Sequence, residues 1–60
     1  MGEKLKAARK AAGLKQSELA AAVGCRPEEV SRWENGTRAP RADMLKSLAE
    51  ALGCKIDDII

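Results

Sequence analysis

Histidine, tyrosine and phenylalanine are absent from this sequence, and Trp33 is its only aromatic residue. Only two cysteines occur, and they are not arranged as Cys-x-x-Cys, so a zinc site would lack ligands. No base is placed to activate either thiol, and no pair of carboxylates suggests a catalytic cleft. We therefore expect no metal site, no cofactor, no small-molecule substrate and no enzymatic activity.

Each of the two cysteines, Cys25 and Cys54, directly follows a glycine. A small apolar residue at such a position is suited to packing against a core. A disulfide between the two is geometrically possible, although it would be unusual in a reducing cytosol. We favour packing, and the sequence leaves the disulfide open.

Long apolar runs are also missing. A membrane-crossing helix needs roughly 18 apolar residues, and no stretch approaches that length. The first ten residues lack the apolar core of a signal peptide. With 60 residues the chain has room for one compact unit. We expect a single domain over residues 1–60, located in the cytoplasm and not in a membrane.

Alanine, leucine, lysine, arginine and glutamate dominate the sequence, and this composition favours helices over strands. Apolar residues recur at helical spacing between breaks at glycines and at Asn35-Gly36. The pattern predicts helices over residues 3–12, 16–23 and 27–34, a fourth between Pro40 and Gly53, and a short final helix over 56–60. The predicted fold class is all-α, a compact five-helix bundle.

Residues 19–30 are echoed 29 positions later by residues 48–59. Both segments predict a helix, a glycine corner and a second helix whose first turn carries acids. Two copies fall short of the three that a solenoid usually needs. We interpret the echo as a repeated local structure.

Charge is distributed unevenly along the chain. Residues 1–41 carry nine basic and five acidic side chains, a balance of +4, whereas residues 42–60 carry two basic and four acidic ones, a balance of −2. A positive front and a slightly negative rear would orient the domain towards a polyanion. A solvated surface of mixed charge is the alternative.

The segment from residue 16 to about residue 35 fits a helix-turn-helix pattern, in which the second helix has few inward anchors and a free outer face. With Val30 set inward, Glu28 and Arg32 each lie about 160° away on that outer face. Arg32 is suited to guanine O6 and N7, and Glu28 to cytosine N4. The alternative is an exposed salt bridge between the two side chains.

Three segments resemble the phage repressor and Cro type of helix-turn-helix protein: Gly-Leu-Lys-Gln-Ser-Glu-Leu-Ala at 13–20, Val-Ser-Arg-Trp-Glu-Asn-Gly at 30–36 and Leu-Ala-Glu-Ala-Leu-Gly at 48–53. The resemblance covers nearly the whole chain. It implies a lambda-repressor-like, five-helix DNA-binding domain of a transcription regulator, which commonly acts as a dimer on two half-sites.

The resemblance also implies roles for individual residues. Gln16 would contact a phosphate and support the base-reading side chains, and Arg9 would pair with Glu34 to tie the first helix to the third. Trp33 is expected in the core because it lies three residues after Val30. The residues expected to face bases are Arg26, Pro27, Glu28 and Arg32, and those expected to clamp the DNA backbone are Asn35, Thr37 and Arg38.

The sequence departs from the family pattern at three helix starts, where Lys15, Arg26 and Arg41 replace the usual Ser or Thr cap. Each lost cap should cost about 1 kcal/mol, and a cation there opposes the helix dipole. Phosphate contact by these three cations is our hypothesis for this pattern. Neutral substitution or an engineered origin explains it equally well. The acids Glu28 and Glu29 are a further departure, because they would lie near phosphates.

We therefore expect sequence-specific binding of double-stranded DNA through a helix over residues 27–34 in the major groove. The alternatives are a protein-binding module, which could bury the Ile59-Ile60 end in a partner, and a designed scaffold without a ligand. The same isoleucines make a homodimer plausible. Phosphate-driven binding should weaken steeply with salt, whereas apolar association should not.

Overall fold

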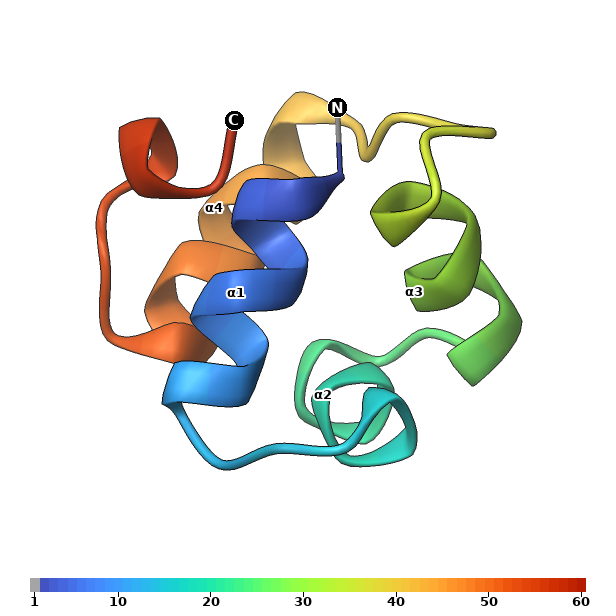
Figure 1. Ribbon diagram of the computed structural model, residues 1–60, viewed down its shortest axis with the longest axis horizontal. Helices are drawn as coiled ribbons and strands as arrows, with labels where there is room; N and C mark the ends of the chain where they lie inside the picture. The colour runs from blue at the N-terminus through green and yellow to red at the C-terminus, as the bar shows by residue number, and fades with distance from the viewer. Residues whose placement is uncertain (1) are drawn as a thin grey trace.

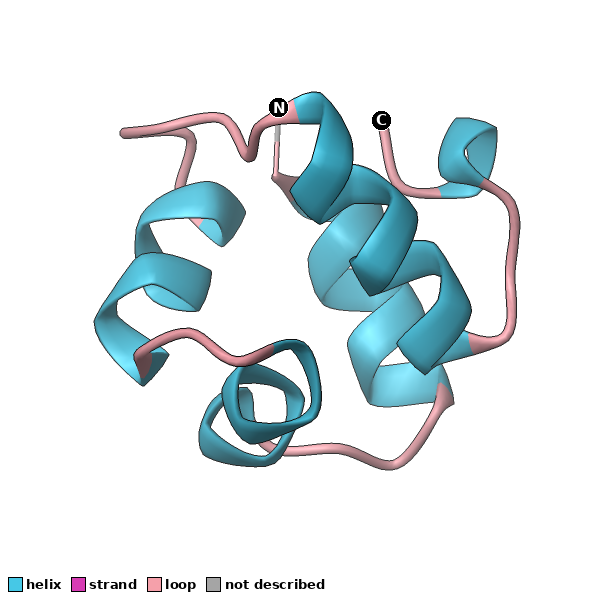
Figure 2. Ribbon diagram, turned by 180° about the vertical axis from the view of Figure 1, so that it is seen from behind, coloured by secondary structure: helices cyan, strands magenta, loops and turns pink. Residues whose placement is uncertain are grey.

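The computed structural model describes residues 2–60, which form four α-helices followed by a 3₁₀ helix, with no strand in that range (Figures 1 and 2). The all-helical prediction is confirmed. Short loops join the elements, and the start of α1 lies at the same end of the molecule as the C-terminus (Figure 1). The elements are α1 (Glu3–Ala11), α2 (Gln16–Val23), α3 (Pro27–Glu34), α4 (Ala42–Leu52) and η1 (Ile56–Asp58).

The short final helix predicted over residues 56–60 is a 3₁₀ helix over Ile56–Asp58. The N–H of Asp58 donates to the carbonyl of Lys55 at 3.0 Å, and the N–H of Ile59 donates to that of Ile56 at 3.0 Å. Bonds three residues apart define a 3₁₀ helix, which is used in short pieces. Within residues 2–60, no helix is both long enough and apolar enough to cross a bilayer.

The core forms where the apolar stripes of the helices meet. Leu19 of α2, Val30 of α3 and Leu48 of α4 are fully buried. α2 packs against both α3 and α4, while η1 packs against α4 and α1 (Figure 1). Trp33 is 9% exposed and belongs to this core, so the indole is not a surface platform for stacking.

The repeated sequence segments have the same local geometry. Gly24 and Gly53 end α2 and α4 with φ of 78° and 68°, the left-handed conformation that glycine adopts readily. After each glycine the cysteine N–H bonds back to the helix, Cys25 to the Ala20 carbonyl at 2.9 Å and Cys54 to the Ala49 carbonyl at 3.0 Å. The echo is therefore a repeated helix–corner–helix unit.

Both cysteines are partly buried against the core, and both are free thiols. Burial raises the pKa of each thiol, with a further contribution from a carboxylate, Glu29 at Cys25 and Asp58 at Cys54. A raised pKa keeps a thiol protonated and unreactive at neutral pH. The two side chains therefore act as packing residues.

Gly2 lies in a buried position where α1 approaches the end of α3. A Cβ atom built on Gly2 would lie 2.0 Å from the Trp33 carbonyl oxygen and 2.3 Å from that of Glu34. Because backbone must move to relieve such contacts, we expect Gly2→Ala to lower the free energy of unfolding by about 2 kcal/mol. Urea denaturation measures the change. Lys4→Ala, at an exposed site of α1, is the control, and equal stability of the two variants would contradict the close approach.

Candidate nucleic-acid interface

The outer face of α3 borders a shallow hollow of about 430 Å³ beside the start of α2. Val30 and Trp33 bury the opposite side of α3 in the core, which leaves Glu28 and Arg32 exposed. The hollow brings together four of the residues expected to contact DNA and one more, Ser31; its lining is Gln16, Pro27, Glu28, Ser31 and Arg32. Within this hollow the surface is concave, open and polar.

Ser31 was not predicted from the sequence, because the helical projection singled out only Glu28 and Arg32 and the family resemblance added only Arg26 and Pro27. The side chain is half-buried and lines the hollow. A helical projection contained the necessary signal, because Ser31 follows Pro27 by four residues and such residues share a face. Its hydroxyl adds one donor and two acceptor positions to this surface.

Arg32 is not held by an acidic neighbour. Among residues 2–60, the one ion pair within 4.0 Å joins Arg9 to Glu34, so Glu28 and Arg32 are not bridged. The same holds for the other cations near this face, Lys15, Arg38 and Arg41. Their charges are therefore available to an external anion.

A buried ion pair holds α1 against the end of α3. Arg9 Nε donates to Glu34 Oε2 at 2.6 Å, and Arg9 Nη2 donates to Glu34 Oε1 at 3.1 Å, a two-pronged geometry. Arg9 Nη1 also donates to the Leu14 carbonyl at 2.8 Å. The side chains are 9% and 4% exposed, so the pair is part of the interior.

Gln16 connects this interior pair to the hollow. Its Nε2 donates to Glu34 Oε1 at 3.1 Å, while its side chain also lines the hollow on the α3 side. Since one N–H points inward, the amide orientation is fixed, and the second N–H and the carbonyl oxygen remain for an external partner. The hydrogen bond to Glu34 therefore holds the Gln16 side chain in one orientation, whereas an amide surrounded only by water would be free to rotate.

Electrostatics keep Glu34 ionised. Burial by itself would raise the pKa of Glu34, but hydrogen bonds from Arg9 and Gln16 outweigh it and leave the pKa below its ordinary value. The hydrogen bond to Glu34 likewise raises the pKa of Arg9, against the opposite effect of burial. Both groups therefore carry full charge at neutral pH.

The starts of α2, α3 and α4 lack side-chain caps. Lys15, Arg26 and Arg41 have the extended backbone of N-cap residues, and none makes a capping bond with its side chain. Lysine and arginine have no acceptor atom with which to do so. At α2 the Glu18 carboxylate partly compensates by accepting the N–H of Lys15 at 2.8 Å. Lys15 and Arg26 are exposed and border neither hollow of this face.

The linker between α3 and α4 begins with a tight turn. Asn35 Oδ1 accepts the Thr37 N–H at 2.9 Å and the Thr37 hydroxyl at 2.5 Å. Beyond this turn the Arg38 N–H donates to the Arg32 carbonyl at 3.2 Å. Asn35, Thr37 and Arg38 are all exposed, so the turn is a fixed but accessible segment.

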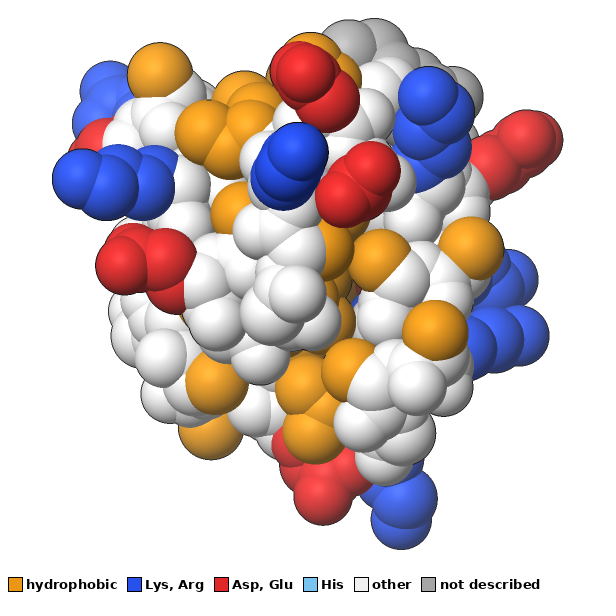
Figure 3. Space-filling view, turned by 90° about the vertical axis from the view of Figure 1, so that its left-hand side faces the viewer, with side chains coloured by type: hydrophobic (Ala, Val, Ile, Leu, Met, Phe, Trp, Pro, Cys, Tyr) orange, Lys and Arg blue, Asp and Glu red, His pale blue; other side chains and the backbone are white. Residues whose placement is uncertain are grey.

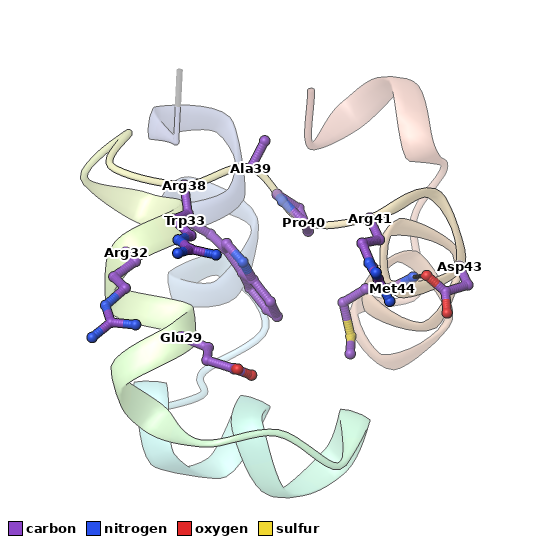
Figure 4. A pocket seen from close by; sticks show the side chains of 9 residues that line it. All are labelled: Glu29, Arg32, Trp33, Arg38, Ala39, Pro40, Arg41, Asp43 and Met44. Atoms are coloured by element: carbon purple, nitrogen blue, oxygen red, sulfur yellow. Dashed lines mark hydrogen bonds between the residues drawn. The ribbon is translucent and has the colours of Figure 1, made fainter.

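A second hollow of about 440 Å³ lies between α3, this linker and the start of α4 (Figure 4). Trp33 forms part of its wall, and Arg38 and Arg41 line it from the linker. Arg32 borders both hollows, although its guanidinium points away from α4 whereas Glu29 points towards it (Figure 4). Three of the four arginines expected to contact DNA, Arg32, Arg38 and Arg41, therefore line one hollow, and Arg26 does not.

The far side of the molecule, which carries η1, looks different. Acidic and basic side chains are interspersed there around a band of hydrophobic side chains (Figure 3). Ile56 and Ile60 are the exposed large hydrophobic residues of the described chain, at 37% and 54% exposure. This face carries no excess of cations comparable to the group of arginines at the α3–α4 linker.

Comparisons with known proteins identify the family of the chain. A helix-turn-helix family model matches residues 5–59. Repressor protein C2 of Salmonella phage P22 is 33% identical over 60 residues, which are 100% of this chain but only 28% of that repressor. The chain thus spans less than a third of that relative.

Solved structures give the same result. The P22 c2 repressor in complex with a synthetic operator superposes with a TM-score of 0.92 and 32% identity, covering 98% of this chain and 89% of that one. The restriction-modification controller protein C.AhdI from Aeromonas hydrophila gives 0.91 and 30%, covering 98% and 89%. The regulator ClgR from Corynebacterium glutamicum gives 0.91 and 31%, covering 97% and 62%. The resemblance seen in the sequence is confirmed, and the chain belongs to the helix-turn-helix family.

Proposed function

We propose that this domain binds double-stranded DNA sequence-specifically, with α3 in the major groove, and that it serves a transcription regulator. The observation that carries the proposal is the outer face of α3, where Arg32 is exposed and free of any carboxylate within residues 2–60. The likeness to a repressor bound to its operator supports it. In helix-turn-helix complexes the N-terminal part of the unit's second helix, which is α3 here, faces the base edges.

Base recognition falls to the side chains at the start and outer face of α3. Arg32 has the planar fork that suits guanine O6 and N7, and Glu28 can accept from cytosine N4. Pro27 contributes shape alone, since it lacks a donor, and Arg26 precedes it at the helix start. A site containing G·C pairs follows from this donor and acceptor pattern.

Phosphate contact falls to residues at the start of α2 and on the linker between α3 and α4. Gln16 retains one N–H for a phosphate, and Asn35 retains its amide NH₂ because its Oδ1 is held by Thr37. The proposed backbone contacts are Lys15, Gln16, Asn35, Thr37, Arg38 and Arg41. These contacts orient the domain, while the outer face of α3 supplies the specificity.

A homodimer is part of the same proposal. One domain covers few base pairs, and two copies on paired half-sites would bind more tightly. The exposed Ile56, in η1, and Ile60, at the C-terminus, offer apolar surface for a second copy. Binding to chromosomal or phage DNA would place the protein inside the cell.

Selection from a random duplex library at low salt tests the proposal. We expect enrichment of a short motif that contains a G·C pair. If no sequence is enriched above background, the DNA-reading proposal fails, and a protein-binding or scaffold role takes its place.

A further inference from the structure

We propose that Lys6 of α1 and Gln16 of α2 together bind one phosphate of the DNA backbone, beside the buried Glu34 carboxylate. Lys6 is a contact in addition to those named above, and it comes from a helix outside the helix-turn-helix unit. The inference rests on the proposed function, because the phosphate belongs to bound DNA.

Lys6 lies on the edge of α1 that borders the end of α3. A Cβ atom built on Gly2 would lie 2.3 Å from the Glu34 carbonyl oxygen, and the Lys6 N–H donates to the Gly2 carbonyl at 3.0 Å, one helical turn later. Arg9, whose Nε donates to the Glu34 carboxylate at 2.6 Å, is turned by about 60° from Lys6. Gly2 and Arg9 are buried and Lys6 is exposed, so Lys6 forms the rim of this contact.

Electrostatics agree with this placement. Burial would raise the pKa of Glu34, but hydrogen bonds from Arg9 and Gln16, and then the charges of Arg9 and Lys6, leave it below its ordinary value. The Lys6 ammonium is therefore close enough for the carboxylate to respond to its charge. Even so, Lys6 forms no ion pair within 4.0 Å among residues 2–60.

The Glu34 carboxylate is already committed to other donors. Its two oxygens accept three hydrogen bonds, from Arg9 Nε, Arg9 Nη2 and Gln16 Nε2. The charges of Arg9 and Glu34 cancel, so Lys6 leaves this part of the surface with a net charge of +1. An external anion is the partner that compensates it.

Gln16 supplies the second donor of the site. Glu34 holds one of its amide N–H groups, and the other remains for an external acceptor. Gln16 is also the first residue of α2, where the helix dipole favours an anion. The flexible four-carbon stem of Lys6 lets its ammonium reach an oxygen of the same phosphate.

Affinity for the duplex selected by the parent, measured by fluorescence anisotropy at one low salt concentration, tests the contribution of Lys6. We expect Lys6→Gln to bind about fivefold more weakly, the effect of losing one pair of opposite charges about 4 Å apart in water. Lys6→Arg should retain most of the affinity. Lys4→Gln, with the same change in net charge at an exposed position about 160° away around α1, should bind like the parent.

Uncharged methylphosphonates, placed at one backbone position of that duplex at a time, identify the phosphate. At one position we expect the parent to lose about fivefold in affinity and Lys6→Gln to lose nothing further. Gln16→Ala should lose less than the parent at that same position. A general effect of the positive surface would not depend on a single phosphate in this way.

Equal affinities of Lys6→Gln and Lys4→Gln would overturn the inference, and so would a loss in Lys6→Gln that no single neutral phosphate removes. A urea midpoint of Lys6→Gln below that of Lys4→Gln would give Lys6 a structural role and would also overturn it. In each case DNA binding by the parent would remain. Absence of any duplex binding by the parent would instead remove the proposed function, and this contact with it.

Discussion

Replacing Glu34 by alanine lowers the free energy of unfolding by about 3–5 kcal/mol, because Arg9 is left charged and buried without a partner. The two side chains are 9% and 4% exposed, so solvent cannot replace the lost carboxylate. A domain of this size has only about 3–9 kcal/mol of stability in total. Urea denaturation followed by Trp33 fluorescence should therefore show a largely unfolded or strongly destabilised variant.

Two further variants separate the effect of breaking the Arg9–Glu34 pair from the effect of substituting any glutamate. Arg9→Met combined with Glu34→Leu removes both charges and should recover much of the lost stability, because a buried pair contributes less than its breakage costs. Glu50→Ala, at an exposed position of α4, should have little effect. If Glu34→Ala behaves like Glu50→Ala, the ion pair does not tie α1 to α3.

DNA affinity should fall about 40-fold when salt rises fourfold. This value follows from three proposed cation–phosphate contacts, by Lys15, Arg38 and Arg41, each adding about 0.9 to the slope of log affinity against log salt. All three side chains are exposed and without an ion-pair partner within residues 2–60, so each can displace a counterion. Fluorescence anisotropy with a labelled duplex at several salt concentrations measures the slope.

Charge-matched variants test which cations contribute. Arg38→Gln should lower the slope by about 0.9, whereas Lys46→Gln, with the same change in net charge, should leave it unchanged. Equal slopes for the parent and Arg38→Gln would exclude the linker as a phosphate clamp. Affinity that hardly depends on salt would indicate apolar association with a different partner.

The helices were predictable from local signals. Strong signals mark the helix boundaries: Pro27 with two acids begins α3, while Gly24 and Gly53 end α2 and α4. The observed bounds of α2 and α3 agree with the predicted ones. The last element was not predictable in type, because one apolar turn after Lys55 is compatible with α and 3₁₀ bonding alike. Burial of Trp33 followed from its spacing to Val30, since three residues return to one helix face.

Parts of the site required the third dimension. The close approach of Gly2 to the end of α3 depends on packing between distant segments, which no local pattern encodes. Similarly, the sequence suggested a salt bridge between Glu28 and Arg32 as an alternative, but only the three-dimensional structure shows that the two are not bridged. Spacing predicts which residues share a face, while the rotamers that decide pairing depend on their surroundings.

The outer face of α3 and the interior of the domain are linked through one side chain, that of Gln16. Gln16 donates to Glu34 inside the domain and lines the hollow outside it. Arg9 fixes the position of the Glu34 carboxylate, and this carboxylate accepts the hydrogen bond from the Gln16 amide. The orientation of Gln16, a proposed DNA contact, therefore depends on the buried ion pair. Rigid support of this kind is what a binding surface needs for specific geometry.

The central claim is that Arg32 on α3 reads a base. Its most direct test is selection from a random duplex library by the parent and by Arg32→Ala in parallel. We expect the two motifs to agree except at one position, where the variant loses a preference for guanine worth about 1–3 kcal/mol. Identical motifs from both proteins, or no motif from the parent, would contradict the claim.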